Sequence, residues 1–107
     1  MTEIPPHLLF DPTEAQLSEQ VREIATRYGG WLAYHTFDSR RSASGFPDWV
    51  FCRPGRLVAL ELKSRGGRAT PEQVAWIGML RTVPGVEAAI IRPADLQLVA
   101  DLLGPKK

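Results

Sequence analysis

Two short apolar segments separated by four residues constrain the fold of this chain more than any other feature. Residues 48–52 and 57–63 are rich in strand-forming side chains, and Pro54-Gly55 between them is a turn signal. A symmetric loop centred on this dipeptide pairs residues whose numbers sum to 109, which places Asp48 opposite Glu61. Pro-Gly does not favour the primed two-residue turns, and a three-residue loop would shift the register by one residue. The hairpin is expected, and its register depends on the loop.

Helical spacing and stop signals divide the rest of the chain. Thr13 and Thr70 are suitable N-caps, and Gly29-Gly30 and Pro84-Gly85 end the first two helices. We expect further elements in addition to the hairpin: helices over residues 13–28, 70–83 and 94–103, and strands over residues 31–37 and 86–91. The resulting order, αβββαβα, predicts an α/β fold in which helices flank a mixed β-sheet.

Apolar side chains at helical spacing identify the expected core. The inward-facing helix residues are expected to be Leu17, Val21, Ile24, Ala25, Tyr28, Val74, Ile77, Leu80, Val83, Leu96, Val99, Leu102 and Leu103. Trp31, Trp49 and Trp76 are expected to be core or dimer contacts rather than platforms for stacked bases. The single Cys52 cannot form an internal disulfide, and we expect it to be a buried strand residue.

Length and composition limit the class of protein. The 107 residues suit one domain, expected over residues 13–104 after an irregular lead-in at residues 1–12. The hydrophobic fraction of 44% and charged fraction of 23% argue against disordered, collagen-like and coiled-coil chains. No apolar run approaches the roughly 20 residues of a spanning helix, and residues 1–6 lack the regions of a secretion signal. We expect a cytoplasmic protein without a membrane partner.

Positive charge is concentrated in the middle of the chain. The net charge is only +1, but residues 38–68 carry seven basic and three acidic side chains, whereas residues 1–37 carry two and five. A basic segment favours a phosphate-containing partner, and a solvated basic surface accounts for it about equally well.

Three charged residues in the hairpin suggest a metal site. Glu61 lies within an apolar strand, where an unpaired carboxylate is costly unless one face of the strand is wet. Alternation along the strand puts Glu61 and Lys63 on one face. Opposed Asp48 and Glu61 would have Cβ atoms about 5 Å apart, close enough for both carboxylates to hold one divalent cation. Lys63 would then lie beside the cation, or it simply neutralises Glu61 as an ion pair.

Several short motifs in this order resemble one known family. They are Thr13-Glu14, Gly30-Trp31, Tyr34-His35-Thr36, Asp38-Ser39-Arg40, Gly45-Phe46-Pro47-Asp48, Glu61-Leu62-Lys63 and Thr70-Pro71-Glu72-Gln73. The chain resembles a VRR-NUC domain, a branch of the PD-(D/E)xK nuclease superfamily, over nearly all of residues 13–103. The resemblance implies a restriction-endonuclease-like core and a metal-dependent endonuclease that hydrolyses DNA. Stand-alone domains of this size resemble phage enzymes that form homodimers and cut branched DNA such as four-way (Holliday) junctions, in a bacterial or phage-infected cell.

The resemblance also implies roles for individual residues. Asp48, Glu61 and the backbone carbonyl of Leu62 would bind Mg²⁺, or Mn²⁺ in its place, and Lys63 would be catalytic. Gln73 would approach the metal, although Thr70-x-x-Gln73 is also a capping box whose amide bonds back to its own helix.

The resemblance also suggests roles for residues in the first helix and in the basic loops, each with an alternative. Glu14 matches an acid that holds a second ion or a metal-bound water, with Glu19 as the alternative, and either also suits an exposed helix face. The expected DNA contacts, which also suit a polar surface loop, are His35, Ser39, Arg40, Arg41, Arg65 and Arg68. A nuclease for flaps, single strands or linear duplex, and a non-catalytic DNA-binding module, remain the alternatives.

Overall fold

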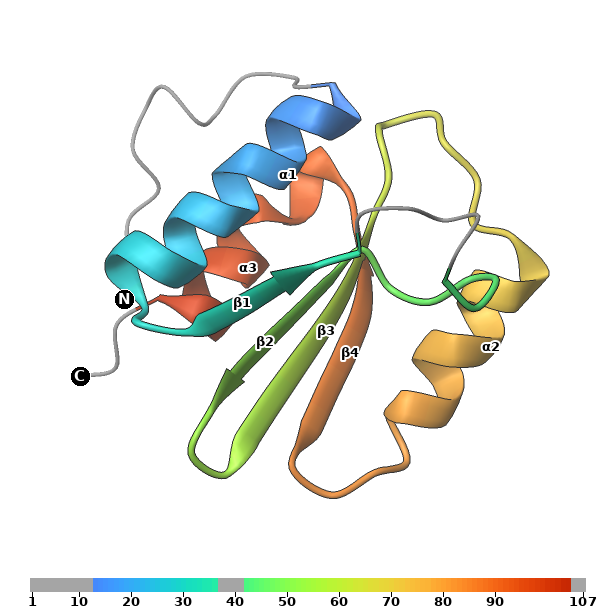
Figure 1. Ribbon diagram of the computed structural model, residues 1–107. Helices are drawn as coiled ribbons and strands as arrows, with labels where there is room; N and C mark the ends of the chain where they lie inside the picture. The colour runs from blue at the N-terminus through green and yellow to red at the C-terminus, as the bar shows by residue number, and fades with distance from the viewer. Residues whose placement is uncertain (1–12, 37–41, 105–107) are drawn as a thin grey trace.

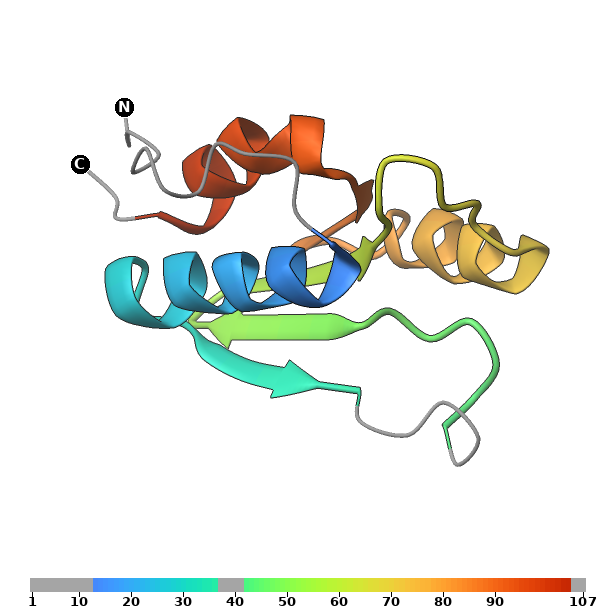
Figure 2. The same ribbon diagram turned by 90° about the horizontal axis from the view of Figure 1, so that it is seen from above.

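The computed structural model describes residues 13–36 and 42–104, which form one four-stranded sheet with helices on both faces (Figures 1 and 2). The predicted order of elements is confirmed. The elements are α1 (Glu14–Glu23), the π-helical turn η2 (Ile24–Tyr28), β1 (Leu32–His35), β2 (Trp49–Arg53), β3 (Arg56–Leu62), α2 (Pro71–Leu80), β4 (Val86–Ile91), the 3₁₀ turn η3 (Pro93–Asp95) and α3 (Leu96–Leu103). The predicted lead-in at residues 1–12 lies outside the described residues.

The sheet is mixed, with strands in the order β1-β2-β3-β4. The pairs β1–β2 and β2–β3 are antiparallel, whereas β3 and β4 are parallel and are connected through α2. Figures 1 and 2 show α1 and α3 on one side of the sheet and α2 on the other. None of the helices in the described ranges has the length and apolar character needed to cross a membrane.

The predicted hairpin register is confirmed. Arg53 pairs with Arg56 and Trp49 with Leu60, so paired residue numbers sum to 109. The loop has two residues, and Gly55 at its second position has a φ of 76°. Proline followed by a residue with positive φ is the arrangement of a type II turn. The turn therefore keeps the two-residue length without the primed geometry that Pro-Gly disfavours.

Most of the predicted core is buried between the sheet and the pair α1 and α3. This larger cluster includes the fully buried residues Leu17, Val21, Phe51, Val58, Leu60, Val99 and Leu103. Under α2 the core is much smaller, with Ala59, Ile77 and Ala88 buried. Because side chains alternate along β3, Leu60 and Leu62 face the larger cluster while Ala59 and Glu61 face the α2 side.

Some burial predictions were wrong. Cys52 is exposed, because it lies on the α2 side of β2 while α2 packs on β3 and β4. Val74 is also exposed, since each step of three residues turns about 60° around a helix and Val74 lies to one side of Ile77, which faces the sheet. Val83 is exposed because α2 ends at Leu80 and not near residue 83, as the sequence had predicted. Tyr28 is 41% exposed at the end of the first helical segment, where the winding changes to a π turn.

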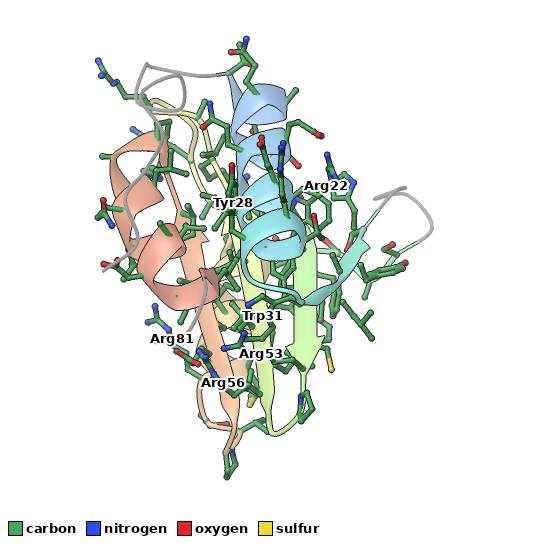
Figure 3. All side chains as sticks on the ribbon, turned by 90° about the vertical axis from the view of Figure 1, so that its left-hand side faces the viewer. Arg22, Tyr28, Trp31, Arg53, Arg56 and Arg81 are labelled. Atoms are coloured by element: carbon green, nitrogen blue, oxygen red, sulfur yellow. The ribbon has the colours of Figure 1, made fainter. Side chains whose placement is uncertain are left out.

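Two arginines of the basic middle segment belong to the fold. The Arg53 guanidinium lies 4.3 Å from the centre of the Trp31 ring and the Arg56 guanidinium 5.1 Å from it, and Arg56 also pairs with Glu87 (Figure 3). The Trp31 indole N–H donates to the carbonyl of Leu103 at 2.9 Å. Part of the positive charge concentrated in residues 38–68 therefore stabilises the fold and is not available to bind a phosphate.

The loop before β2 packs against the first turn of α2. Gly45 has a φ of 84°, and a Cβ atom placed on it would lie 2.5 Å from the carbonyl carbon of Glu72. The Trp76 indole N–H donates to the Ser44 carbonyl at 3.1 Å, and the Trp76 ring meets Phe46 edge-to-face at 5.1 Å. The glycine therefore permits the close contact that fixes the approach to Asp48.

We predict that Gly45→Ala destabilises the protein by about 3 kcal/mol or more, because the substitution adds both a backbone clash and a disfavoured φ. Gly55→Ala adds only the disfavoured φ, since no atom lies within 4 Å of a Cβ there, and should cost about 1 kcal/mol. Gly66→Ala, with open space and no positive φ, should change stability by less than about 0.5 kcal/mol. Urea unfolding measures all three; equal costs at Gly45 and Gly55 would contradict the close contact.

Candidate active site

Asp48 lies immediately before β2 and is held from both neighbouring strands. Its Oδ2 accepts a hydrogen bond from the Leu62 N–H at 2.8 Å, and its carbonyl accepts one from the Thr36 N–H at 2.8 Å. The Thr36 hydroxyl also donates to the carbonyl of the buried Pro47 at 2.7 Å. Glu61 is the residue that follows in the same register, so the two carboxylates approach each other at the end of the hairpin.

Glu61 is a buried carboxylate on the central strand, with only 2% of its surface exposed. Its Oε2 accepts a hydrogen bond from the Gln73 side-chain amide at 2.8 Å and lies 3.5 Å from the Lys63 ammonium nitrogen. Its Oε1 is buried and has no hydrogen-bond partner among the described residues. An unpartnered buried oxygen of this kind is costly, and a bound cation would satisfy it.

The surroundings of Glu61 change its proton affinity. Burial raises the pKa of its carboxyl group to about 7, the charge of Asp48 adds to the increase, and Lys63 partly offsets it. The protein thus holds two carboxyl groups together where both cannot ionise without cost. A divalent cation would remove that cost by binding between them.

Gln73 has the two contacts that sequence reasoning treated as alternatives. Its side-chain oxygen accepts from the Thr70 N–H at 2.8 Å, and the Thr70 hydroxyl accepts from the Gln73 N–H at 3.2 Å, which completes the capping box. Its side-chain amide nitrogen donates to Glu61. The cap therefore orients the amide toward the carboxylate.

The backbone of Leu62 also faces Asp48. In an antiparallel strand the N–H and C=O of one residue point to the same neighbouring strand, and the Leu62 N–H binds Asp48. Its carbonyl is thus on the side where a cation between Asp48 and Glu61 would lie. Two carboxylates and a carbonyl form an oxygen ligand set that suits Mg²⁺ or Mn²⁺.

A cleft of about 480 Å³ opens beside Asp48, between α1 and the ends of β1 and β2. It is lined by Glu14, Ala15, Ser18, Glu19, Arg22, His35, Asp48, Trp49 and Leu62. In residues 13–36 and 42–104 no three His, Cys, Asp or Glu side chains lie close enough to hold one ion, so Glu14 shares the cleft without completing a three-carboxylate cluster. Glu19 is hydrogen-bonded to Arg22, which lowers the pKa of its carboxyl group.

Comparison with known proteins supplies a structural relative. The chain is similar to a solved structure described as a VRR_NUC domain protein, with a TM-score of 0.60, 20% sequence identity, and coverage of 91% of this chain and 95% of the other. The chain has the VRR-NUC fold. No family model and no curated protein matches the sequence.

Within the VRR-NUC fold, four of the predicted site residues come together: Asp48, Glu61, Lys63 and Gln73. Glu14 and His35 line the adjoining cleft. Arg65 and Arg68 are exposed in the segment between Lys63 and α2. Ser39, Arg40 and Arg41 lie outside the described residues.

Sequence reasoning missed Arg22 and did not assign a role to Ser18 or to Trp49 at the cleft. A signal was present, because Glu14, Ser18 and Arg22 follow one another at intervals of four residues and so share a helix face. That this face borders a cleft, however, depends on how α1 packs across the sheet.

We predict that the metal-free protein loses stability as pH rises from 4.5 to about 7, because the raised pKa means that the folded state binds the Glu61 proton more tightly. The contribution of this proton is complete below pH 4.5 and is lost as pH passes the folded-state value. Glu61→Gln should remove this dependence on pH. The thermal midpoint of the variant in chelator, measured relative to that of wild type, should therefore increase as pH rises. A constant difference between the two proteins at every pH would contradict the assignment.

The two contacts of Gln73 can be separated by measuring Mn²⁺ affinity in a calorimetric titration. Gln73→Ala removes the bond to Glu61 as well as part of the cap, and it should weaken Mn²⁺ binding by about 10- to 100-fold. Thr70→Ala removes the cap oxygen alone; it should cost about 1 kcal/mol of stability with little change in Mn²⁺ affinity. Equal losses of affinity would show that the cap, and not the bond to Glu61, matters.

Proposed function

We propose that this protein is a metal-dependent nuclease that hydrolyses phosphodiester bonds in DNA. The observation that carries the proposal is the state of Glu61, which is buried beside Asp48 with one oxygen engaged by Gln73 and Lys63 and the other without a partner in the described part of the chain. A structural role alone does not account for a carboxylate with that arrangement. The VRR-NUC fold supports the proposal.

Mg²⁺ is the proposed cofactor, with Mn²⁺ able to replace it. Asp48, Glu61 and the Leu62 carbonyl would hold the ion, and Glu14 would contribute from α1 through water or to a second ion. When bound, the cation would supply a Lewis acid that polarises the phosphodiester and activates water for attack. Gln73 keeps the Glu61 carboxylate oriented for this contact.

Lys63 is the proposed catalytic cation. Its side chain is 13% exposed, and its ammonium lies 3.5 Å from Glu61, which holds it at the edge of the metal site. A positioned ammonium stabilises the negative charge that develops on the phosphate during hydrolysis. In this proposal, the Lys63 ammonium pairs with Glu61 when no DNA is bound and acts on the phosphate when DNA is present.

Branched DNA is the proposed substrate, and a homodimer the proposed assembly, in the cytoplasm of a bacterial or phage-infected cell. The exposed Arg65 and Arg68 lie in the segment between Lys63 and α2 and are proposed to contact the DNA backbone, as are His35 and Ser39–Arg41. Two sites related by a two-fold axis would suit paired incisions in a four-way junction. A non-catalytic module is disfavoured because Asp48, Glu61 and Lys63 meet at one place.

Cleavage of labelled four-way junction, flap and linear DNA, each with Mg²⁺ or with chelator, tests the proposal. Metal-dependent cleavage of the junction in preference to the others is the expected result. Preference for another DNA would correct the substrate, and absence of metal-dependent cleavage of any of them would refute the nuclease.

In the same assay, Lys63→Met should reduce the cleavage rate by at least about 100-fold, because it removes a preorganised charge at the reacting phosphate. The variant should still fold and bind Mn²⁺, measured in parallel, since it keeps the ligands and an apolar stem; in chelator the pKa of Glu61 should rise further, because Lys63 no longer offsets the burial of that carboxyl group. Activity within about tenfold of wild type would exclude the proposed role of Lys63.

A further inference from the structure

The cleft beside Asp48 is lined by an arginine, Arg22, to which the proposed reaction gives no role. From α1, Glu14, Ser18 and Arg22 line it in one row, and a helix rise of 1.5 Å per residue separates the first from the last by about 12 Å. The acidic lining residues are Glu14, Glu19 and Asp48, and Arg22 and His35 line the cleft from α1 and β1. The cleft therefore extends beyond the metal ligands.

A buried aromatic ring forms the floor of this extension. Trp49 is 5% exposed, its ring stacks on Phe51 with centroids 5.3 Å apart, and its indole N–H donates to the Ser18 hydroxyl at 2.7 Å. On the cleft side the exposed imidazole of His35 stacks on Trp49 with centroids 4.5 Å apart. His35 thus has a fixed platform, and α1 is tied to the same ring through Ser18.

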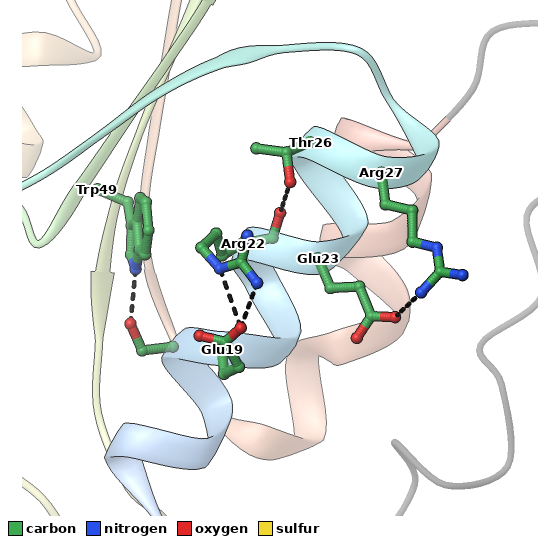
Figure 4. Close-up of polar contacts among 7 residues, drawn as sticks. Glu19, Arg22, Glu23, Thr26, Arg27 and Trp49 are labelled. Atoms are coloured by element: carbon green, nitrogen blue, oxygen red, sulfur yellow. Dashed lines mark hydrogen bonds and ion pairs between the residues drawn. The ribbon is translucent and has the colours of Figure 1, made fainter.

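Arg22 is oriented in the cleft by Glu19, which uses only some of the N–H donors of the arginine. It is hydrogen-bonded through Nε and Nη2 to a single oxygen of Glu19, and the two side chains are 45% and 64% exposed (Figure 4). An exposed pair of this kind contributes little to stability, but it orients the guanidinium. Because arginine has five N–H donors, the remaining ones can bind a phosphate without loss of the Glu19 contact.

We propose that Arg22 binds a backbone phosphate of the DNA strand whose cleaved bond lies at Asp48 and Glu61, with His35 and Ser18 lining the same subsite. The inference rests on the proposed nuclease function. One strand of DNA carries a phosphate for about every 3.4 Å of rise, so a strand lying along about 12 Å of cleft presents more than one phosphate. The subsite fixes the position of the strand without reading its sequence.

The chain offers a matched control in η2, the π-helical turn that continues α1. Arg27 is also paired with an acid, Glu23, which lies four residues before it. Arg27 Nη1 is 3.4 Å from Glu23 Oε1, and Arg27 does not line the cleft. Figure 4 shows Arg22 on the side of α1 that faces Trp49, whereas Arg27 points away from Trp49 from the following turn, η2. Arg22→Ala and Arg27→Ala therefore each remove one positive charge from the continuous segment α1–η2, and only Arg22→Ala changes the lining of the cleft.

Binding of labelled DNA in Ca²⁺, measured by fluorescence anisotropy over a range of salt, compares these variants. Arg22→Ala should weaken binding by about tenfold and reduce the slope of log affinity against log salt by about one. Arg27→Ala should change neither quantity. Circular dichroism and the thermal midpoint check folding, and Arg22→Gln serves as a second variant.

A neutral methylphosphonate placed at successive positions near the cut site locates the contact. Wild type should lose affinity at one position outside the cleaved bond, and Arg22→Ala should lose nothing further there. If wild type binds DNA and Arg22→Ala has the same affinity, salt slope and methylphosphonate profile as Arg27→Ala, the proposed subsite is wrong. The nuclease proposal is not affected by that result. Wild type that binds no DNA would overturn the nuclease proposal itself.

Discussion

The pairing of β2 with β3 in a single register underlies every other feature of the site. The turn at Pro54-Gly55 sets that register, and a shift of one residue would move each side chain of a strand to the opposite face. Asp48 would then lose the Leu62 N–H, and the apolar residues of the strand would face α2 instead of the larger core. The burial of Leu60 and Leu62 therefore helps to hold the acidic groups in place.

α2 connects the two acidic groups from outside the hairpin. Its capping box orients Gln73 toward Glu61, and its first turn packs against Gly45 in the loop that leads to Asp48. Trp76, one turn further on, holds the same loop through Ser44. A single short helix thus contacts Glu61 directly and the loop that leads to Asp48.

The two neighbouring carboxyl groups determine the electrostatics of the site. Glu61 is kept next to Asp48 in a buried position that raises the pKa of its carboxyl group to about 7, and Lys63 offsets only part of the cost. A cation bound between the two carboxyl groups, as proposed, would offset the remaining cost. On the α1 side of Asp48, the cleft is lined by Arg22 and His35 as well as by the acids Glu14 and Glu19, and Arg22 is held there by Glu19.

Local patterns in the sequence determined the order of elements, the N-caps at Thr13 and Thr70, and the hairpin, because each depends on residues close in the chain. The register of the hairpin was the expected one, but it was fixed only when the structure showed a loop of two residues. The exposure of Cys52 and Val74 could not be predicted in this way, since it depends on which strands α2 covers. Only the tertiary structure decided that Gln73 serves both its cap and Glu61, and that Arg22 lies in the cleft with Asp48. The physical reason is that the angle and position at which a helix packs on a sheet follow from contacts between distant residues, which no local pattern contains.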